Sequence, residues 1–304
     1  MITKKKTITS KLSFNRLKNS FKFRFENKFY FEQWFLIFKF GKNSDLKLLS
    51  EYNQLIPPKD RFWADPHVIF KNNMYHIFFE EYIYKNKKGI ISLIKMEKNG
   101  NYTKPVKILE EDYHLSYPFI FEYENQVYMI PETHSVKTIQ IYRCIEFPEK
   151  WEFCKVILKN IDAVDSTLLH YNKKWWLFTG VKNEQNSDWG NLHIFYSDNP
   201  LSENWIPHQM NPIITSKRNS QPAGKIFSDG NSLYRPAQTS TDKEYGREII
   251  INKIEILNEK EYNEKEIKEI KPWNKKIKGI HTVNFENEFT ILDAKWKRKN
   301  MPKI

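Results

Sequence analysis

Acidic, basic and imidazole side chains recur in this chain at the ends of short predicted strand pairs. The residues that begin a first strand are Asp65, Asp165 and His281, and those that end a second strand are Glu80, Glu132, Arg235 and Asp293. Carboxyl groups held close together raise one another's pKa, which is how many acid–base sites are built. The pattern therefore predicts acid–base chemistry, provided that the fold brings these strand ends together.

The strand pairs form a repeat. The five copies cover residues 65–80, 118–132, 165–179, 223–235 and 281–293. Each copy is two strands joined by a turn that contains Asn, a residue that tolerates the left-handed conformation of tight hairpins. Successive copies begin 53, 47, 58 and 58 residues apart. A repeat of about 50 residues with three or four strands is typical of a β-propeller blade. We therefore predict an all-β fold, a five-bladed β-propeller.

The remaining strands follow from the same architecture. Third strands are predicted at 90–95, 138–144, 191–197 and 247–251, and the charged stretch 258–276 is either an outer strand or a short helix. The fifth copy has little chain after Lys299, so we expect residues 33–40 to complete the last blade and close the ring. The predicted domains are a basic arm, residues 1–30, and the propeller, residues 31–304.

In a propeller, the first strand of each blade lines the central channel and the second runs back antiparallel. The start of the first and the end of the second therefore meet at one mouth, where we expect the ionisable residues to converge. Simpler roles remain open for single residues. Asp65 before Pro66 also suits a turn cap, Glu132 could pair with Arg143 or Arg235, and His281 could be a buried hydrogen-bonding residue. Glu81 is expected to be a solvated neighbour of Glu80.

The positive charge of the chain is concentrated at its N-terminus. Residues 1–28 hold nine Lys or Arg and one acid, which leaves about +4 of the net charge of +12 for the rest. A nearly balanced propeller argues against nucleic-acid binding. The arm mixes basic residues with Phe and Leu, so it suits either peripheral contact with an anionic membrane or packing against the propeller. Only two cysteines, Cys144 and Cys154, occur, and we expect a cytoplasmic protein.

Six stretches carry a family resemblance. They are residues 61–67 (RFWADPH), 113–118 (YHLSYP), 130–133 (IPET), 163–167 (AVDST), 234–238 (YRPAQ) and 279–282 (GIHT). In these stretches the chain resembles bacterial proteins related to the N-terminal domain of plant glucosamine inositolphosphorylceramide transferase. More distantly, it resembles the five-bladed propellers of furanose-cleaving glycoside hydrolases such as arabinanases. The resemblance implies a five-bladed propeller with a carbohydrate-related role.

The likeness to the hydrolases implies roles for particular residues. Asp65 matches the aspartate that activates water, and Asp165 matches the aspartate that tunes the pKa of the acid. His281 matches a histidine near the channel centre, which implies a divalent cation near it in some members; no other metal ligand set is expected. The match fails in blade four, where residues 221–227 (QPAGKIF) and 235–238 (RPAQ) contain no acid. A sugar alkoxide needs a proton to leave, whereas a nucleotide diphosphate can be stabilised by cations instead.

The leading interpretation is a glycosyltransferase of surface polysaccharide or glycolipid assembly, with a nucleotide sugar as donor and a glycan or lipid-linked acceptor. Asp65 would act as the base, with Glu132 and Asp165 as catalytic partners. The residues expected to bind substrate are Trp63, Glu80, Tyr117, Lys225, Arg235, Gln238 and His281, of which Arg235 and Lys225 would hold the phosphate. Two alternatives stay open. One is a glycoside hydrolase or phosphorylase with Glu132 or Glu80 as general acid, and the other is a non-catalytic glycan-binding propeller.

Overall fold

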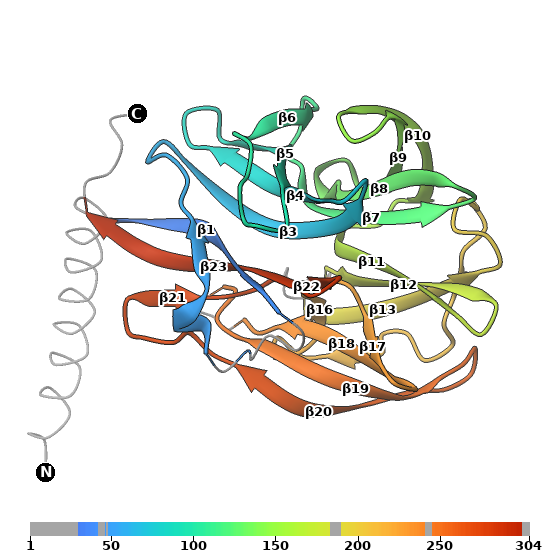
Figure 1. Ribbon diagram of the computed structural model, residues 1–304. Coiled ribbons are helices and arrows are strands. Elements are labelled where there is room, and N and C mark those ends of the chain that lie inside the picture. The colour runs from blue at the N-terminus through green and yellow to red at the C-terminus, as the bar shows by residue number, and fades with distance from the viewer. Residues whose placement is uncertain (1–29, 42–45, 47, 183–189, 241–244, 300–304) are drawn as a thin grey trace, which may run out of the picture.

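The computed structural model describes residues 30–41, 46, 48–182, 190–240 and 245–299. The predicted arm, residues 1–30, lies outside the described residues except for Tyr30. The fold is a five-bladed β-propeller, as predicted: five antiparallel sheets of four or five strands stand around a central channel (Figure 1). Two short 3₁₀ helices, η1 (Leu49–Glu51) and η2 (His134–Val136), are the only helices in the described residues. None of the described helices has the length and apolar character needed to cross a membrane.

The first two blades each have four strands. Blade one consists of β3 (Arg61–Lys71), β4 (Met74–Ile83), β5 (Lys88–Met96) and β6 (Val106–Leu109). Blade two consists of β7 (Ser116–Tyr123), β8 (Gln126–Glu132), β9 (Thr138–Glu146) and β10 (Lys150–Lys159). Within each blade, every strand pairs with the next strand along the chain. Cys144 and Cys154 are both free thiols.

Blades three and four each have five strands. Blade three consists of β11 (Ala163–Tyr171), β12 (Lys174–Val181), β13 (Asn191–Ser197), β14 (Ile206–Pro207) and β15 (Ile214–Thr215). Blade four consists of β16 (Gln221–Pro222), β17 (Phe227–Asp229), β18 (Ser232–Gln238), β19 (Ile249–Leu257) and β20 (Tyr262–Ile270). The charged stretch 258–276 therefore contains an outer strand, β20, rather than a helix.

Blade five joins the two ends of the described chain. It consists of β21 (Ile277–Gly279), β22 (Val283–Glu286) and β23 (Phe289–Lys299), followed by β1 (Tyr30–Phe40) and β2 (Asn53–Leu55). β1 pairs antiparallel with β23 along its whole length, from Tyr30 opposite Lys299 to Phe40 opposite Phe289. The predicted closure by an N-terminal strand is thus confirmed. This pairing removes two sheet edges that would otherwise expose unpaired backbone groups.

Tight turns join the first two strands of each blade. In four blades the turn contains two non-glycine residues with positive φ: Asn72 and Asn73, Glu124 and Asn125, Asn172 and Lys173, and Asn287 and Glu288. Positive φ at both central residues is the signature of the type I′ turn, whose twist matches that of the flanking strands. These turns lie at the end of the channel opposite to the predicted site.

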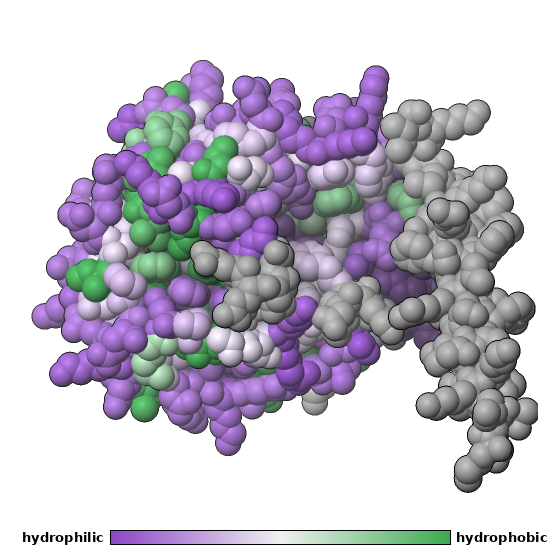
Figure 2. Space-filling model, turned by 180° about the vertical axis from the view of Figure 1, so that it is seen from behind, coloured by the Kyte–Doolittle hydropathy of each residue, from purple (hydrophilic) through white to green (hydrophobic). Residues whose placement is uncertain are grey.

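The hydrophobic core lies between the blades. Five clusters of buried side chains fill the five interfaces, so that each blade packs on two neighbours. The face shown in Figure 2 is mostly hydrophilic, with hydrophobic residues in small groups. Because the blades are held by side-chain packing on both faces, the inner strand ends are placed rigidly around the channel.

Candidate active site

Three residues occupy the same place in the first strands of blades one, two and three. Asp65, Tyr117 and Asp165 each lie where the pairing with the second strand shifts register. Their φ angles are 51°, 41° and 54°, values that non-glycine residues rarely adopt. Such strain costs on the order of 1–3 kcal/mol per residue and is retained where the surroundings enforce it. The bulges direct the side chains of Asp65 and Asp165 toward the channel mouth, whereas the Tyr117 hydroxyl reaches the Gly224 N–H.

The amide of each bulge is bonded to a carboxylate of the preceding blade. The Asp65 N–H donates to Asp293 Oδ2 at 3.0 Å. The Tyr117 N–H donates to the carboxylate of Asp65, and the Asp165 N–H donates to that of Glu132. Buried amides must find acceptors, and a charged acceptor makes the stronger bond. The acidic residues at the mouth therefore join neighbouring blades as well as facing the cavity.

These residues surround a cavity of ≈ 220 Å³. Five of the residues predicted from the sequence line it: Asp65, Glu80, Glu132, Asp165 and His281. The rest of the lining consists of Trp34, Phe62, Tyr82, His114, Ser116 and Tyr245. No Lys or Arg lines the cavity within the part of the chain that the structure describes. The cavity thus combines acidic groups with aromatic walls, which suits an uncharged, hydroxyl-rich ligand better than an anion.

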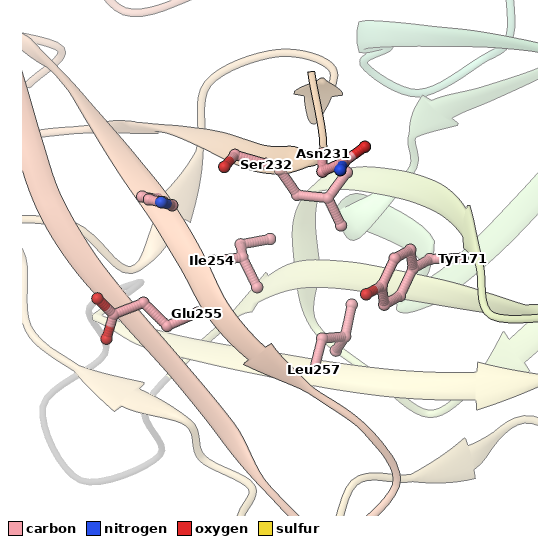
Figure 3. Close-up of a pocket in the computed structure, with 8 residues that line it drawn as sticks. Tyr171, Asn231, Ser232, Ile254, Glu255 and Leu257 are labelled. Carbon is pink, nitrogen blue, oxygen red and sulfur yellow. The ribbon is translucent and has the colours of Figure 1, made fainter. Parts of the chain in front are cut away.

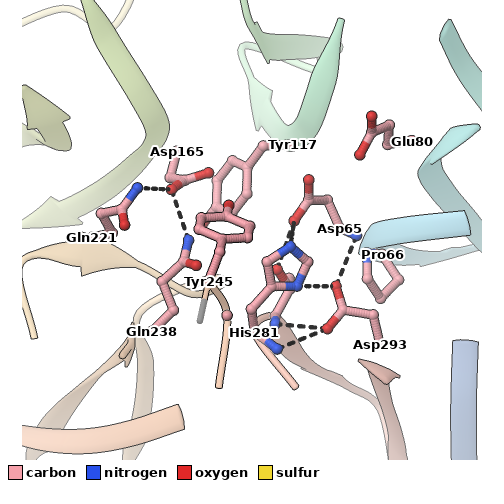
Figure 4. Close-up of polar contacts among 12 residues, drawn as sticks. Asp65, Pro66, Glu80, Tyr117, Asp165, Gln221, Gln238, Tyr245, His281 and Asp293 are labelled. Carbon is pink, nitrogen blue, oxygen red and sulfur yellow. Dashed lines mark hydrogen bonds and ion pairs between the residues drawn. The ribbon is translucent and has the colours of Figure 1, made fainter. Parts of the chain in front are cut away.

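His281 lies between two carboxylates (Figure 4). Its Nδ1 is 2.5 Å from Asp293 Oδ2, and its Nε2 is 3.5 Å from Asp65 Oδ1. Burial lowers the pKa of His281, but the attraction of Asp293 and Asp65 outweighs it, so the net direction is upward. The Trp34 ring stacks on the imidazole with ring centroids 4.0 Å apart. The charge of His281 in turn lowers the pKa of Asp65, but burial acts more strongly and the net direction for Asp65 is upward.

Other carboxyl groups of the cavity also have raised pKa values. Burial and the nearby carboxylates raise the pKa values of Glu80 and Asp165 well above the ordinary range. Burial and the charge of Asp65 raise the pKa of Glu132 to about 8. Glu132 is thus mostly protonated near neutral pH. Burial also raises the pKa of Asp65, but the charge of His281 opposes that rise. Different surroundings of two nearby carboxyl groups are what an acid–base pair requires.

His114 completes the wall beside Glu80. Its Nδ1 accepts a 3.0 Å hydrogen bond from the Gly89 N–H, which leaves Nε2 to carry the proton. Nε2 lies 3.4 Å from Glu80 Oε1. Burial, with a smaller contribution from His134, lowers the pKa of His114 to about 4. At neutral pH His114 is therefore a neutral donor that faces Glu80.

Asp65, His281 and Asp293 are the only three His, Cys, Asp or Glu residues of the described chain whose ligand atoms lie close enough to hold a metal ion. The side-chain atoms of these three residues already make contacts within the protein. Asp293 accepts bonds from the amides of residues 65, 281 and 282 and contacts His281, while Asp65 Oδ1 accepts from the Thr282 hydroxyl. A cation would have to replace several of these hydrogen bonds. The group does not fit the divalent cation that the resemblance implies, and we derive no step through one.

Three residues predicted to bind substrate do not line this cavity. Arg235 is fully buried within blade four, where its Nη2 donates to Glu264 Oε1 at 2.6 Å and to the Asn219 carbonyl at 2.7 Å. Lys225 lies deeper in the channel, with Nζ 3.2 Å from the Val68 carbonyl, and burial lowers its pKa. Trp63 packs in the core between blades five and one. Trp63 and Arg235 lie on strands β3 and β18, whereas Lys225 lies in the segment between β16 and β17.

Two further predicted residues support the cavity from behind. The Tyr117 hydroxyl accepts a 2.7 Å bond from the Gly224 N–H and contacts Thr167 Oγ1 at 2.8 Å. Gln238 Nε2 donates to Asp165 Oδ2 at 2.9 Å (Figure 4). Both residues are buried and position the acidic groups. Glu81, expected to be solvated, is instead buried against Arg61, Trp63 and Ser92.

Four aromatic residues and His114 were not singled out from the sequence. His114 and Phe62 fall within the family-like stretches 113–118 and 61–67, so their positions carried a signal. Trp34 lies on the closing strand, and only its pairing opposite Lys295 shows that it reaches the mouth. Tyr82 follows the acidic pair at the end of β4. Tyr245 belongs to a polar loop that offered no such signal.

A larger hollow lies elsewhere. It measures ≈ 320 Å³ and opens at the turn end of the channel between blades three and four (Figure 3). Its lining includes Tyr171, Leu257, Asn231 and Ser232, with Lys253 and Glu255 as the only ionisable side chains besides the tyrosine. It has no group of converging acids. A hollow of ≈ 850 Å³ between blades four and five is larger still, but of its acids Asp229 and Glu288 are exposed and Glu286 is half-buried, unlike the buried acids of the mouth. The chemistry of the lining, rather than the size of the hollow, identifies the mouth as the site.

A family model and curated relatives match most of this chain. The family model described as "Glucosamine inositolphosphorylceramide transferase 1, N-terminal" matches residues 52–296. The chain belongs to this family. It is 37% identical over 213 residues to glucosamine inositolphosphorylceramide transferase 1 of Arabidopsis thaliana, covering 68% of the chain and 27% of the relative. A protein of the same name from Oryza sativa subsp. japonica is 36% identical over 210 residues, with coverages of 67% and 27%. The chain thus spans about a quarter of the length of these curated relatives.

Solved structures with the same fold come from carbohydrate-cleaving enzymes. A family 117 glycoside hydrolase of Zobellia galactanivorans has a TM-score of 0.56 and 10% identity, covering 90% of this chain and 92% of its own. An α-L-arabinofuranosidase of Coprinopsis cinerea has a TM-score of 0.55 and 13% identity, with coverages of 73% and 76%. At these identities the likeness establishes the propeller fold and nothing finer.

Proposed function

We propose that the cavity binds a sugar and transfers its glycosyl group with acid–base catalysis, Glu132 acting as the proton donor and Asp65 as the base. The observation that carries this proposal is the contrast between Glu132, whose pKa is raised to about 8, and Asp65, which lies 3.5 Å from His281. Glu132 would protonate the oxygen that leaves C1 of the sugar. Asp65 would take the proton of the incoming hydroxyl, from water or from an acceptor.

The remaining lining would hold the sugar. Glu80, Asp165 and the neutral His114 present hydrogen-bonding groups on one side. The aromatic walls formed by Trp34, Phe62, Tyr82 and Tyr245 offer flat apolar surfaces to the ring. Glu80 is a second candidate for the acid, because its pKa is also raised and it faces the same cavity. Glu132 in blade two, or Glu80 in blade one, would thus replace the general acid that blade four lacks.

Membership in a family named for a transferase favours a second candidate, transfer from a nucleotide sugar. In that reaction Asp65 would deprotonate the acceptor, and the leaving diphosphate would need cations. Arg235 and Lys225, expected to supply them, lie outside the cavity lining. We therefore rank acid-assisted cleavage of a glycosidic bond above it. A glycan-bearing lipid, as the ceramide in the relatives' name suggests, is a suitable acceptor or substrate in either case.

The test is to incubate the full chain with a panel of glycosides, including furanosides, with and without acceptor alcohols, and separately with nucleotide sugars. Glu132→Gln should lower cleavage of alkyl glycosides on the order of 100-fold or more, yet spare glycosyl fluorides, whose leaving group needs no proton. Asp65→Asn should impair both. Controls are Asp229→Asn and Glu255→Gln, which alter exposed residues near the turn end. Turnover of nucleotide sugars alone would favour the second candidate, and no turnover of any donor would reject both.

A further inference from the structure

Two neighbouring segments of blade five form a basic edge beside the cavity. We define the lysine edge as Lys275, Lys276, Lys278, Lys295, Lys297 and Lys299. The first three lie just before and within β21, which pairs with β23, and the last three lie at the end of β23. Side chains alternate along a strand, so residues 295, 297 and 299 share one face. Apart from Lys295, these lysines are exposed.

The lysine edge begins at the cavity wall. Lys295 Nζ donates to the Tyr245 carbonyl at 3.0 Å and lies 5.0 Å from the centre of the Trp34 ring. Both Tyr245 and Trp34 line the cavity, and Trp34 stacks on His281. Strand β23 then continues away from Asp293 to Lys299, opposite the start of β1. The basic surface is therefore a direct extension of the mouth.

The charge of this surface is not balanced along its own strands. Residues 271–279 and 295–299 contain eight Lys or Arg and no Asp or Glu. Acids from adjoining strands contact it, among them Glu32, 3.3 Å from Lys295, and Glu269, 2.6 Å from Lys271. Like charges gathered in this way repel one another, and an anionic partner relieves that repulsion. The rest of the propeller carries mixed charges, so this edge is a distinct feature.

We propose that the lysine edge docks on an anionic lipid bilayer and places the mouth next to the membrane surface. The edge is a projecting ribbon rather than a concave pocket: the β1–β23 pair and the β21 region extend on the same side of the ring (Figure 1). Seven of the eight cations in residues 271–279 and 295–299 are lysines, which act as point charges and do not require the paired geometry of arginine. Clusters of four to eight such residues are typical of attraction to anionic lipids.

The chain order supports this choice of partner over a soluble acidic polymer. Strand β1 begins at Tyr30, opposite Lys299, and the sequence that precedes it, residues 1–28, contains nine Lys or Arg and several Phe and Leu. Basic residues mixed with large apolar ones suit a membrane interface, where charge and apolar contact act together. The inference holds whichever glycosidic chemistry the cavity performs.

The experiment is co-sedimentation of the full chain with vesicles of phosphatidylcholine alone or mixed with phosphatidylglycerol. Lys275→Gln, Lys276→Gln and Lys278→Gln are combined in one variant. A matched variant combines Lys98→Gln, Lys104→Gln and Lys260→Gln, three exposed lysines at the turn end of the propeller. We expect binding to the anionic vesicles only, weakened on the order of tenfold or more in the edge variant, nearly unchanged in the control, and reduced by salt.

Three outcomes would overturn the inference. They are equal binding of the edge variant and the parent, equal loss in the two variants, and equal binding of the parent to neutral vesicles. Retention of a soluble acidic polysaccharide without vesicle binding would assign the edge to a polymer instead. Circular dichroism and thermal unfolding of each variant show that the fold is kept. Because binding is measured without substrate, its failure is distinct from failure of the proposed reaction.

Discussion

The backbone N–H of Asp65 donates a 3.0 Å hydrogen bond to Oδ2 of Asp293, a residue 228 positions further along the chain. The bond joins the first blade to the fifth, the pair between which the ring closes. Asp293 is completely buried and also holds His281. One carboxylate therefore supports both the closure of the fold and the charge state of the site.

Replacing Asp293 with Asn should weaken both roles. The Asn side chain has only one acceptor oxygen. Either the Asp65 N–H and His281, which share Oδ2, or the amides of residues 281 and 282, which share Oδ1, would then face a donor. We expect a loss of unfolding free energy of about 3 kcal/mol, as is usual when one partner of a buried pair is removed. The pKa of His281 should fall, since Asp293 is its strongest upward influence. Urea unfolding and an NMR titration of the imidazole measure the two effects. An unchanged His281 pKa would contradict the assignment.

Glu132 should make the parent protein less stable at alkaline pH. Its pKa is raised to about 8 in the folded state, above the ordinary value near 4.5, so its contribution to stability is present at low pH and lost as the pH rises toward 8. Gln cannot ionise, so Glu132→Gln should gain stability over the parent between pH 5 and pH 9. The gain is on the order of 2–4 kcal/mol. Urea unfolding at the two pH values checks this, with Glu255→Gln as the exposed control. A gain that does not depend on pH would count against a protonated Glu132.

Arg235 should matter for stability and little for catalysis. Arg235→Met leaves Glu264 buried without its cation, which should lower the unfolding free energy by about 3–5 kcal/mol. Adding Glu264→Leu should recover part of this loss, because the uncompensated charge is then removed. Activity per folded molecule should stay near the parent value in the double variant. A stable double variant without activity would return Arg235 to the site, as the sequence had suggested.

We expect that no other residue is tolerated at Gly89, because there is no room for a side chain. A Cβ at this position would lie 2.4 Å from the Leu115 carbonyl oxygen and 2.8 Å from Glu80 Oε1. Gly89→Ala should therefore shift Glu80 and His114, lower stability on the order of 1–3 kcal/mol and reduce activity. The comparison is Gly230→Ala, which meets nothing within 4 Å but has a φ of +59°. That change should cost about 1 kcal/mol and leave activity intact. Thermal unfolding and assays of both variants decide the matter, and equal activity losses would refute a local role for Gly89.

Much of the fold could be predicted because a propeller repeats its local signals. Turns such as Asn72–Asn73 and Asn172–Lys173 are encoded by a few adjacent residues, and they set the spacing of the blades. Once the repeat was recognised, ring closure required a strand from the N-terminus, and β1 fills that place. The gathering of Asp65, Glu132 and Asp165 followed from the same geometry, since strand ends in all blades meet at one mouth.

The direction and charge of individual side chains were decided by the tertiary structure. Arg235 lies three residues before Gln238 on β18, yet it pairs with Glu264 on β20, while Gln238 reaches Asp165. The choice depends on local register and on bulges, which a repeat pattern does not reveal. Trp34 and Tyr245 reach the cavity through contacts with His281, far from each other in sequence. The raised pKa of Glu132 arises from burial and from Asp65 in another blade, so it exists only after the ring has closed.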